Sequence, residues 1–416
     1  MTLASGASAL PERGLSVERL GDAVLFLTVA SSSIVLIEPA PYDVLLSLHA
    51  VVAFALGLAL PRAMAPLVVL ILLYDVGGIL SVTQVRWWEG AEHGHPFVFV
   101  AISVMLMIHV IFFAATCAEK PHRLDLIMKA TIVAAVIAAL LGIAGFALDL
   151  EIFTLYGRAK GGFKDPNVFG PFLVLPLIHL ARRMMVGGLW RHWREALWAA
   201  LILAGIFLSM SRAAWGLTAG ALVMLGLVLF VDERSARGRL RLALMGLAGV
   251  AAVILLLAAV LSFDGVRNLF GERAQLIQNY DGERLGRFAR HLLGFLRAAE
   301  LPLGDGPYQF AHVFTEDPHN IFLKSLMAYG WLGFVAYTAL AVWTITALFR
   351  SMFLPRPWKP LAQVVWVTLA GHMVVGWIID TDHWRHFFLL WGFAWAMIAL
   401  EKRHAARRRR AAVLAA

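Results

Sequence analysis

The sequence has very little cysteine and little charge. Cys117 is the single cysteine among 416 residues, so no disulfide can form within the chain, and no Cys/His group has the spacing of a structural zinc site. Charged residues make up 15% and hydrophobic residues 60%, whereas soluble globular domains have about 25% charged and about 45–50% apolar residues. These shortages exclude a disulfide-stabilised domain and a water-soluble fold.

Apolar segments follow one another with short gaps from about residue 20 to about residue 400. A stretch of about 17 to 25 apolar residues can cross a hydrocarbon core about 30 Å thick. The sequence therefore predicts an all-α integral membrane protein of about twelve transmembrane helices, which form one polytopic domain over residues 1–416. The expected helices start near Leu20, Val44, Ala65, Phe97, Leu126, Val168, Ala196, Ala213, Leu240, Ile321, Leu361 and Phe387.

Basic residues alternate between the two sides of the expected bundle. The tails and every second loop hold 23 of the 36 Lys and Arg residues, which predicts cytoplasmic termini and an even number of helices. This alternation argues against nucleic-acid binding as the reason for the net charge of +9. Residues 402–416 then form a basic cytoplasmic tail, in which Arg407 to Arg410 are expected to contact anionic membrane lipids.

Nine of the other 13 basic residues fall in only two loops on the opposite, exported side. The loop from about residue 149 to 166 carries Arg158, Lys160 and Lys164, and the long loop at residues 263–319, between the ninth and tenth helices, carries Arg267, Arg273, Arg284, Arg287, Arg290 and Arg297. Basic residues on this side oppose the topology signal, so they indicate binding of an anionic substrate. Solvated loop charge is the alternative.

The long loop contains an amphipathic segment. Leu285, Phe288, Leu292 and Phe295 recur at helical spacing, while Arg284, Arg287 and His291 form a separate stripe. This pattern predicts a helix that lies on the membrane surface and stops at Pro302.

Three stretches depart from the apolar background, all at the exported ends of expected helices. The first runs from Gly157 to Gly170, where Asp165 is expected to cap a helix that begins at Pro166. Its glycines and basic residues suit a phosphate or sugar contact. The second, Ser209 to Gly216, places Arg212 between two apolar runs; an ionisable residue there is a functional candidate, with snorkelling to the interface as the alternative.

The third stretch runs from Glu316 to Gly333. Asp317 and Pro318 are expected to open a helix, with His319 in its first turn. A lone histidine of this kind is either a catalytic group or a structural hydrogen-bonding group.

Together the three stretches resemble the O-antigen ligase superfamily, which contains O-antigen ligases, polysaccharide polymerases and some protein O-oligosaccharyltransferases. The resemblance covers nearly the whole chain and is carried by DPN at Asp165 to Asn167, S-x-S-R at Ser209 to Arg212, and PHN at Pro318 to Asn320 followed by F-L-x-x-L-x-x-x-G-x-x-G. It implies a multi-pass protein of the bacterial inner membrane with a periplasmic active site. The implied reaction is transfer of a glycan from undecaprenyl diphosphate, without metal or cofactor.

The resemblance also implies roles for individual residues. Arg212 matches the arginine of S-x-S-R, His319 the histidine of PHN, and Arg284 the arginine of the long loop, with Arg287 and Arg290 as competitors for that place. The predicted substrate-binding residues are Arg158, Lys160, Lys164, Asp165, Asn167, Ser211, Arg287, Arg290 and Asn320. A diphosphate leaving group needs fixed positive charge, which a guanidinium supplies. His319 is expected to be the general base, because the dipole of the first helical turn disfavours imidazolium.

Within the superfamily, ligases and polymerases differ mainly in the acceptor. A ligase transfers the glycan to a lipid A core sugar, whereas a polymerase transfers it to another carrier-linked glycan. Some polymerases carry Arg, ten residues and then Gly in exported loops, and no exported Arg here has Gly at that spacing, which favours the ligase. A transporter is the alternative from another class, but transporters tend to bind near the midplane between repeated halves. A purely structural partner would not need Arg212 and His319 together.

Two groups of polar residues look like metal ligands. They are Asp380, Asp382, His383 and His386 in one exported loop, and Glu92, His93 and His95 in another. Since the superfamily uses no metal, the sequence predicts no metal site. The loop with Asp380, between the last two helices, is expected to line the mouth of the active site.

Overall fold

The computed structural model describes residues 17–88, 94–273, 286–314 and 316–415, and helices dominate it. The α-helices are α1 Val17–Ala30, α2 Pro41–Ala55, α3 Ala65–Val82, α4 Pro96–Glu119, α5 His122–Ala147, α6 Pro166–Phe172, α7 Val174–Gly187, α8 Trp193–Leu208, α9 Arg212–Asp232, α10 Ala236–Val260, α11 Asp264–Arg273, α13 Arg287–Ala299, α14 Gln309–Phe314, α15 Ile321–Ser351, α16 Lys359–Val375 and α17 Arg385–Ala415. Short 3-10 helices are η1 Ser31–Ser33, η2 Arg62–Met64, η3 Glu151–Phe153 and η4 Trp190–His192. In the described ranges the strands are β1 Thr154–Leu155 and β2 Arg158–Ala159, which pair antiparallel.

Seven helical segments in the described part of the chain are long and apolar enough to cross a membrane. They are Arg62–Val82, Pro96–Glu119, His122–Ala147, Pro166–Gly187, Arg212–Asp232, Ala236–Ala259 and Ile321–Ser351. The other five expected segments also contain helices, but α1, α2, α8 and α16 have only 14 to 17 residues, and the second half of α17 contains the basic run Arg407 to Arg410. The all-α membrane fold is confirmed; the count of twelve spans stays a prediction.

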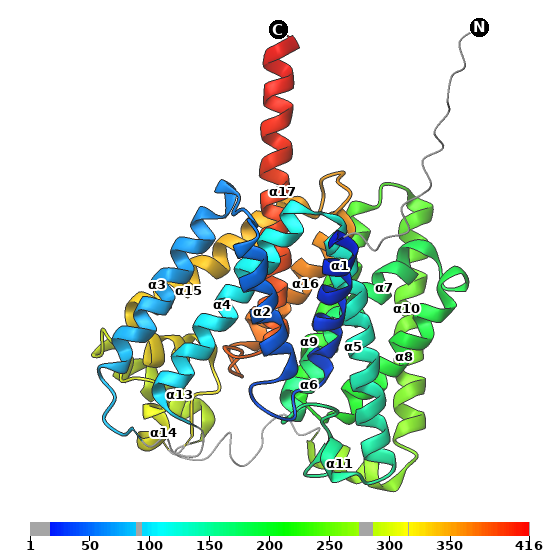
Figure 1. The fold of residues 1–416 in the computed structure, drawn as a ribbon. Coiled ribbons are helices and arrows are strands. Elements are labelled where there is room, and N and C mark those ends of the chain that lie inside the picture. Colours follow the sequence, from blue (N-terminus) through cyan, green and yellow to red (C-terminus); the bar gives the residue numbers. More distant parts are fainter. Residues whose placement is uncertain (1–16, 89–93, 274–285, 315, 416) are drawn as a thin grey trace, which may run out of the picture.

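The helices run up and down in alternation, so that the loops gather at two opposite ends of the bundle (Figure 1). α17 projects from the end at which α1 begins, whereas α6, α11, α13 and α14 lie at the other end. The two loops rich in basic residues therefore lie at the same end, which we call the α13 end.

Glycines bring α3 and α15 close together in the interior. A Cβ atom on Gly77 would lie 2.5 Å from the Tyr329 carbonyl oxygen and 2.8 Å from the Gly333 nitrogen, and one on Gly78 would lie 2.9 Å from the Tyr329 ring. Small residues of this kind let membrane helices approach to backbone contact. Gly333, the last glycine of the F-L-x-x-L-x-x-x-G-x-x-G pattern, is thus a packing residue.

The helix α15 is kinked at Gly330, the other glycine of that pattern. Gly330 has φ 65° and ψ −172°, and a Cβ there would lie 2.7 Å from the Pro302 carbonyl oxygen. The same oxygen accepts a hydrogen bond from the Trp331 backbone N–H at 2.9 Å. Only glycine adopts this conformation without strain, so the kink sets the direction of the first part of α15, Ile321 to Tyr329.

Candidate functional site

Arg158 joins two of the three stretches that the sequence singles out. Its side chain is buried, and its Nε donates to the Ser209 carbonyl oxygen at 2.9 Å while Nη2 donates to Asn167 Oδ1 at 2.8 Å. The guanidinium therefore ties the loop before α6 to the turn between α8 and α9. The sequence predicts that Arg158 and Asn167 bind substrate. In the structure their hydrogen bonds hold the turn that carries Arg212.

The start of α6 follows the predicted capping pattern. Asp165 accepts a hydrogen bond from the Asn167 backbone N–H at 2.6 Å, and Pro166 is the first helical residue. A Cβ on Gly170 would lie 2.6 Å from the Ala214 Cβ, so α6 packs directly on the first turn of α9. Asp165 thus acts here as a helix cap.

The lysines of the same loop take up different positions. Lys164 Nζ forms an ion pair with Glu38 Oε2 at 2.9 Å, and Glu38 Oε1 lies 3.6 Å from Arg385 Nη2. Arg385 also binds Asp43 through two hydrogen bonds of 2.7 Å each. These ion pairs connect the loop before α6, the segment between α1 and α2, and the start of α17. Lys160, directly after β2, is half-buried.

Arg212 is the first residue of α9 and is half-buried. The residue two positions earlier, Met210, is buried and has φ 47°, a conformation that costs energy for a side chain other than glycine. Ser211 caps α9, because its hydroxyl accepts a hydrogen bond from the Ala214 N–H at 3.4 Å. The turn between α8 and α9 is therefore held in an unusual shape that presents Arg212 at the α13 end.

The first part of the long loop packs on this turn. Phe270 of α11 lies 5.7 Å from the Phe207 ring and 5.5 Å from the Trp215 ring, measured between centroids. Phe207 belongs to the last turn of α8 and Trp215 to the first turn of α9, so α11 covers the neighbourhood of Arg212.

We expect Arg158→Ala to destabilise the protein. The change removes one buried and one partly buried hydrogen bond from a charged donor, each worth about 1.5–3 kcal/mol, and frees the turn that carries Arg212. Thermal unfolding in detergent should show a lower Tm, and Arg158→Lys, which has no fork, should recover only part of the loss. Arg191→Ala, an exposed residue of η4, is the matched control and should leave Tm unchanged. An unaltered Tm in Arg158→Ala would contradict this role.

The predicted start of the helix after PHN is wrong by several residues. α15 begins at Ile321, and its cap is Asn320, whose Oδ1 accepts hydrogen bonds from the Phe322 and Leu323 N–H groups at 3.0 and 3.1 Å. The Asn320 amide also donates to the Trp377 carbonyl oxygen at 3.1 Å. Asp317 is not the cap, and His319 precedes the helix instead of occupying its first turn. The helix-dipole argument for a neutral His319 therefore does not apply.

A carboxylate holds His319 instead. The half-exposed His319 places its Nδ1 3.3 Å from Asp380 Oδ1, and the other Asp380 oxygen lies 2.8 Å from Lys324 Nζ. Burial acts to raise the pKa of Asp380, but the charge of Lys324 and the hydrogen bond from His319 outweigh it and hold that pKa well below its usual range. The ring is thus oriented through Nδ1, which faces Asp380, and Nε2 is its second nitrogen.

The helix α13 confirms the predicted amphipathic helix of the long loop, although it ends at Ala299, before Pro302. Its apolar residues Phe288, Leu292 and Leu296 are exposed. Contact of this face with the membrane surface stays a prediction.

The polar face of α13 turns toward the segment before His319. Arg290 Nη1 donates to the Phe314 carbonyl oxygen at 3.1 Å and Nη2 to Glu316 Oε2 at 2.8 Å. His291 is buried, and burial together with the charge of Arg287 lowers its pKa to about 4. Arg287 is half-buried at the start of the helix. Arg284, the predicted second phosphate-binding residue, lies outside the described residues.

The residues that resemble metal ligands in the loop between α16 and α17 and at the start of α17 contact other side chains. Asp380 and Asp382 face Lys324, the His383 Nε2 lies 2.9 Å from Ser103 Oγ, and the His386 ring lies 5.4 Å from the Trp384 ring. Glu92 and His93 lie outside the described residues.

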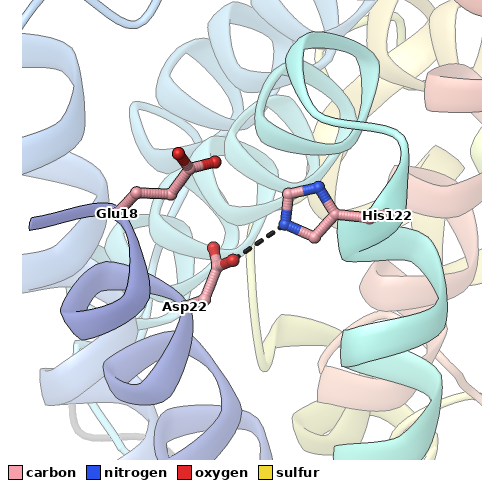
Figure 2. Close-up of side chains that lie close together, drawn as sticks. All are labelled: Glu18, Asp22 and His122. Carbon is pink, nitrogen blue, oxygen red and sulfur yellow. Dashed lines mark hydrogen bonds and ion pairs between the residues drawn. The ribbon is translucent and has the colours of Figure 1, made fainter. Parts of the chain in front are cut away.

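Within the described residues, the group with metal-ligand spacing is a different one: Glu18, Asp22 and His122 at the end opposite α13 (Figure 2). His122 Nε2 lies 2.8 Å from Asp22 Oδ2, while Lys120 pairs with Glu18 and Arg123 with Asp22, each at 2.8 Å. Both carboxylates are thus already neutralised by cations. The group is best described as an ion-pair network that ties α1 to the start of α5.

Lys324 is a residue of the candidate site that the sequence analysis did not select, although its position in an apolar segment could have indicated it. A lysine within an apolar membrane helix is costly unless paired, which is the argument that selected Arg212. Lys324 stands at such a place in α15, and the structure surrounds it with carboxylates.

Residues 196–338, about a third of the chain, match the model of the protein family described as O-antigen ligase. The matched segment runs from α8 into α15 and includes Arg212, the long loop and His319, whereas Asp165 and Asp380 lie outside it. No curated protein matches the chain. The match confirms the predicted resemblance over this segment: residues 196–338 are similar to the O-antigen ligase family, which indicates a membrane enzyme of the O-antigen ligase and polymerase type.

Proposed function

We propose that this protein is a glycosyltransferase of the bacterial inner membrane that moves a glycan from undecaprenyl diphosphate to an acceptor sugar hydroxyl on the periplasmic side. The observation that carries the proposal is the His319–Asp380 pair, placed at the same end of the bundle as Arg212. A histidine oriented by a carboxylate is the arrangement of a general base. The family match of the segment with Arg212 and His319 supports the donor class.

In the proposed reaction, His319 Nε2 takes the proton of the acceptor hydroxyl as its oxygen attacks the anomeric carbon of the donor. The new bond joins that oxygen to the anomeric carbon, and the bond from this carbon to the diphosphate oxygen breaks. Its electron pair leaves with the diphosphate, and the proton on His319 then passes to water. Asp380 stabilises the imidazolium without being protonated itself.

The leaving diphosphate gains negative charge in the transition state. Arg212 supplies a permanently charged, bidentate donor, and it is preorganised by the strained turn at Met210 and the cap at Ser211. Arg284 is proposed as the second arginine, with Arg287 and Arg290 as the alternatives. Of these two, Arg290 donates hydrogen bonds to Phe314 and Glu316, and these bonds hold α13 beside the segment with His319.

A lipid A core sugar is the proposed acceptor, which makes the protein a ligase. A polymerase would use the same chemistry with a second carrier-linked glycan as the acceptor. Purified protein in vesicles, given an undecaprenyl-diphosphate-linked glycan with or without lipid A core, separates the candidate functions. The ligase produces glycan-bearing lipid A core, a polymerase lengthens the carrier-linked glycan without it, and a transporter changes only the leaflet of the donor. The last result would reject the proposal.

The orientation is tested by cysteine labelling with a membrane-impermeant reagent. Residues 158, 212, 284 and 319 should lie on the periplasmic side, and Arg191 and Arg237 on the cytoplasmic side. Because Arg158 is buried, the better reporter is Tyr156→Cys, at a position that is 81% exposed, compared with Arg237→Cys. Cys117 is buried and should stay unlabelled. Only the residue-156 variant should label in intact spheroplasts; labelling of both from one side contradicts the topology.

A further inference from the structure

Lys324 is the fourth residue of α15, at the end of its first turn after the Asn320 cap, and its side chain is buried. Its Nζ is 2.8 Å from Asp380 Oδ2, 3.6 Å from Asp382 Oδ2 and 3.7 Å from Asp317 Oδ2. One buried ammonium group therefore faces three carboxyl groups from two separate segments, one before α15 and one between α16 and α17. A buried charge needs such pairing.

The contact with Asp380 connects Lys324 to the candidate base. Asp380 uses Oδ2 for the lysine and Oδ1 for His319 Nδ1, at 2.8 and 3.3 Å. A carboxylate held at one oxygen by an ammonium group cannot rotate freely, so its second oxygen has a fixed direction. The orientation of the His319 ring depends on that oxygen, because the ring itself is half-exposed.

We propose that Lys324 is a positioning residue for glycan transfer: it fixes the Asp380 carboxylate and, through it, the ring of His319. This inference rests on the proposed role of His319 as the general base. The charges in the cluster suit that role. When His319 takes a proton, the new positive charge faces a group in which three carboxyl groups stand against one ammonium group.

A double-mutant cycle on the purified enzyme in vesicles tests the proposal. Lys324→Met should lower kcat about 10- to 100-fold, the cost of a misplaced catalytic group, with little change in KM for the lipid-linked donor. Lys324→Arg keeps the charge and should recover part of the rate. In the Asp380→Asn background, Lys324→Met should cause no further loss of kcat, because the lysine then has no oriented carboxylate to act through.

A purely structural lysine would give another pattern. Lys359 at the start of α16 pairs with Asp232 at 2.7 Å, at the opposite end of the bundle, so Lys359→Met is the matched control. It should lower Tm and leave kcat unchanged. If Lys324→Met does not fold, the comparison of Lys324→Met/Asp380→Asn with Asp380→Asn still decides, because the double variant contains neither charge of the pair. Equal kcat values support the proposal, and a further tenfold loss overturns it.

The variants His319→Ala and Lys324→Met together show whether the proposed function or only the role of Lys324 is wrong. If His319→Ala transfers glycan at the wild-type rate, the proposed base is wrong and the role of Lys324 falls with it. If His319→Ala is inactive while folded Lys324→Met keeps the wild-type kcat, only the positioning role is overturned.

Discussion

Replacing His319 by alanine is expected to lower glycan transfer about 100- to 10,000-fold, the usual contribution of a general base. The lipid-linked donor should still bind, because its diphosphate is proposed to contact the arginines. His319→Gln keeps a hydrogen-bonding group at the place of the ring but cannot accept a proton, so it should be nearly as inactive as alanine. Steady-state transfer rates and donor binding in vesicles give both quantities.

The matched control for this change is His312→Gln. His312 belongs to α14, and its ring stacks on Trp87 at 4.9 Å between ring centroids. It should transfer glycan at the wild-type rate. A His319→Gln protein that is as active as the control would mean that His319 positions the acceptor, and the role of general base would have to be withdrawn.

Arg212→Ala should reduce the transfer rate by about 10- to 150-fold for each charged hydrogen bond lost in the transition state, at about 1.5–3 kcal/mol per bond. A bidentate contact consists of two such hydrogen bonds, so its loss should reduce the transfer rate by about 150-fold or more. Arg212→Lys should rescue only part of the rate, because an ammonium group keeps the attraction and loses the fork. The measurement is kcat in vesicles at saturating donor.

Arg194→Ala is the corresponding control, since its guanidinium lies over the Trp193 ring at 5.3 Å and at the end of the bundle opposite Arg212. Arg284→Ala is expected to behave like Arg212→Ala. Wild-type transfer by an Arg212→Ala protein at normal abundance would contradict the proposed contact of Arg212 with the leaving diphosphate.

The helices could be predicted from the sequence because each is indicated by a local pattern of apolar residues. Each apolar segment contains a helix where one was expected, and α13 follows from the spacing of Phe288, Leu292 and Leu296. The cap of α6 at Asp165 also follows from two adjacent residues, the aspartate and the following proline. Motifs alone selected Arg212 and His319, which the family match then covers.

The start of α15 could not be derived in this way. Asp317 and Asn320 are both good caps by residue type. The choice between them is made by a distant segment, since Trp377 accepts from the Asn320 amide and the Gly376 carbonyl oxygen accepts from the Ile321 N–H. No local pattern contains that information.

The partners of the buried charges were hidden for the same reason. Arg158 was expected to face substrate, and its partners Ser209 and Asn167 became visible only when the fold placed α6 on α9. Asp380 looked like a metal ligand because its neighbours in sequence are Asp382 and His383. Its actual partners, His319 and Lys324, are more than 50 residues away along the chain.

The kink at Gly330 also bears on the depth in the membrane at which the proposed reaction would take place. α15 has 31 residues, and at about 1.5 Å per residue it is about 47 Å long, whereas a hydrocarbon core is about 30 Å thick. The part after the kink, from Trp331 to Ser351, has about 21 residues and measures about 31 Å on the same rise, so it fills the core by itself. With that part across the core, the part before the kink, which includes Lys324, would extend from the edge of the core toward the lipid headgroups, and His319 directly precedes it. For the proposed reaction, the polyprenyl chain of the donor could then stay in the hydrocarbon while its diphosphate meets the acceptor hydroxyl at that level.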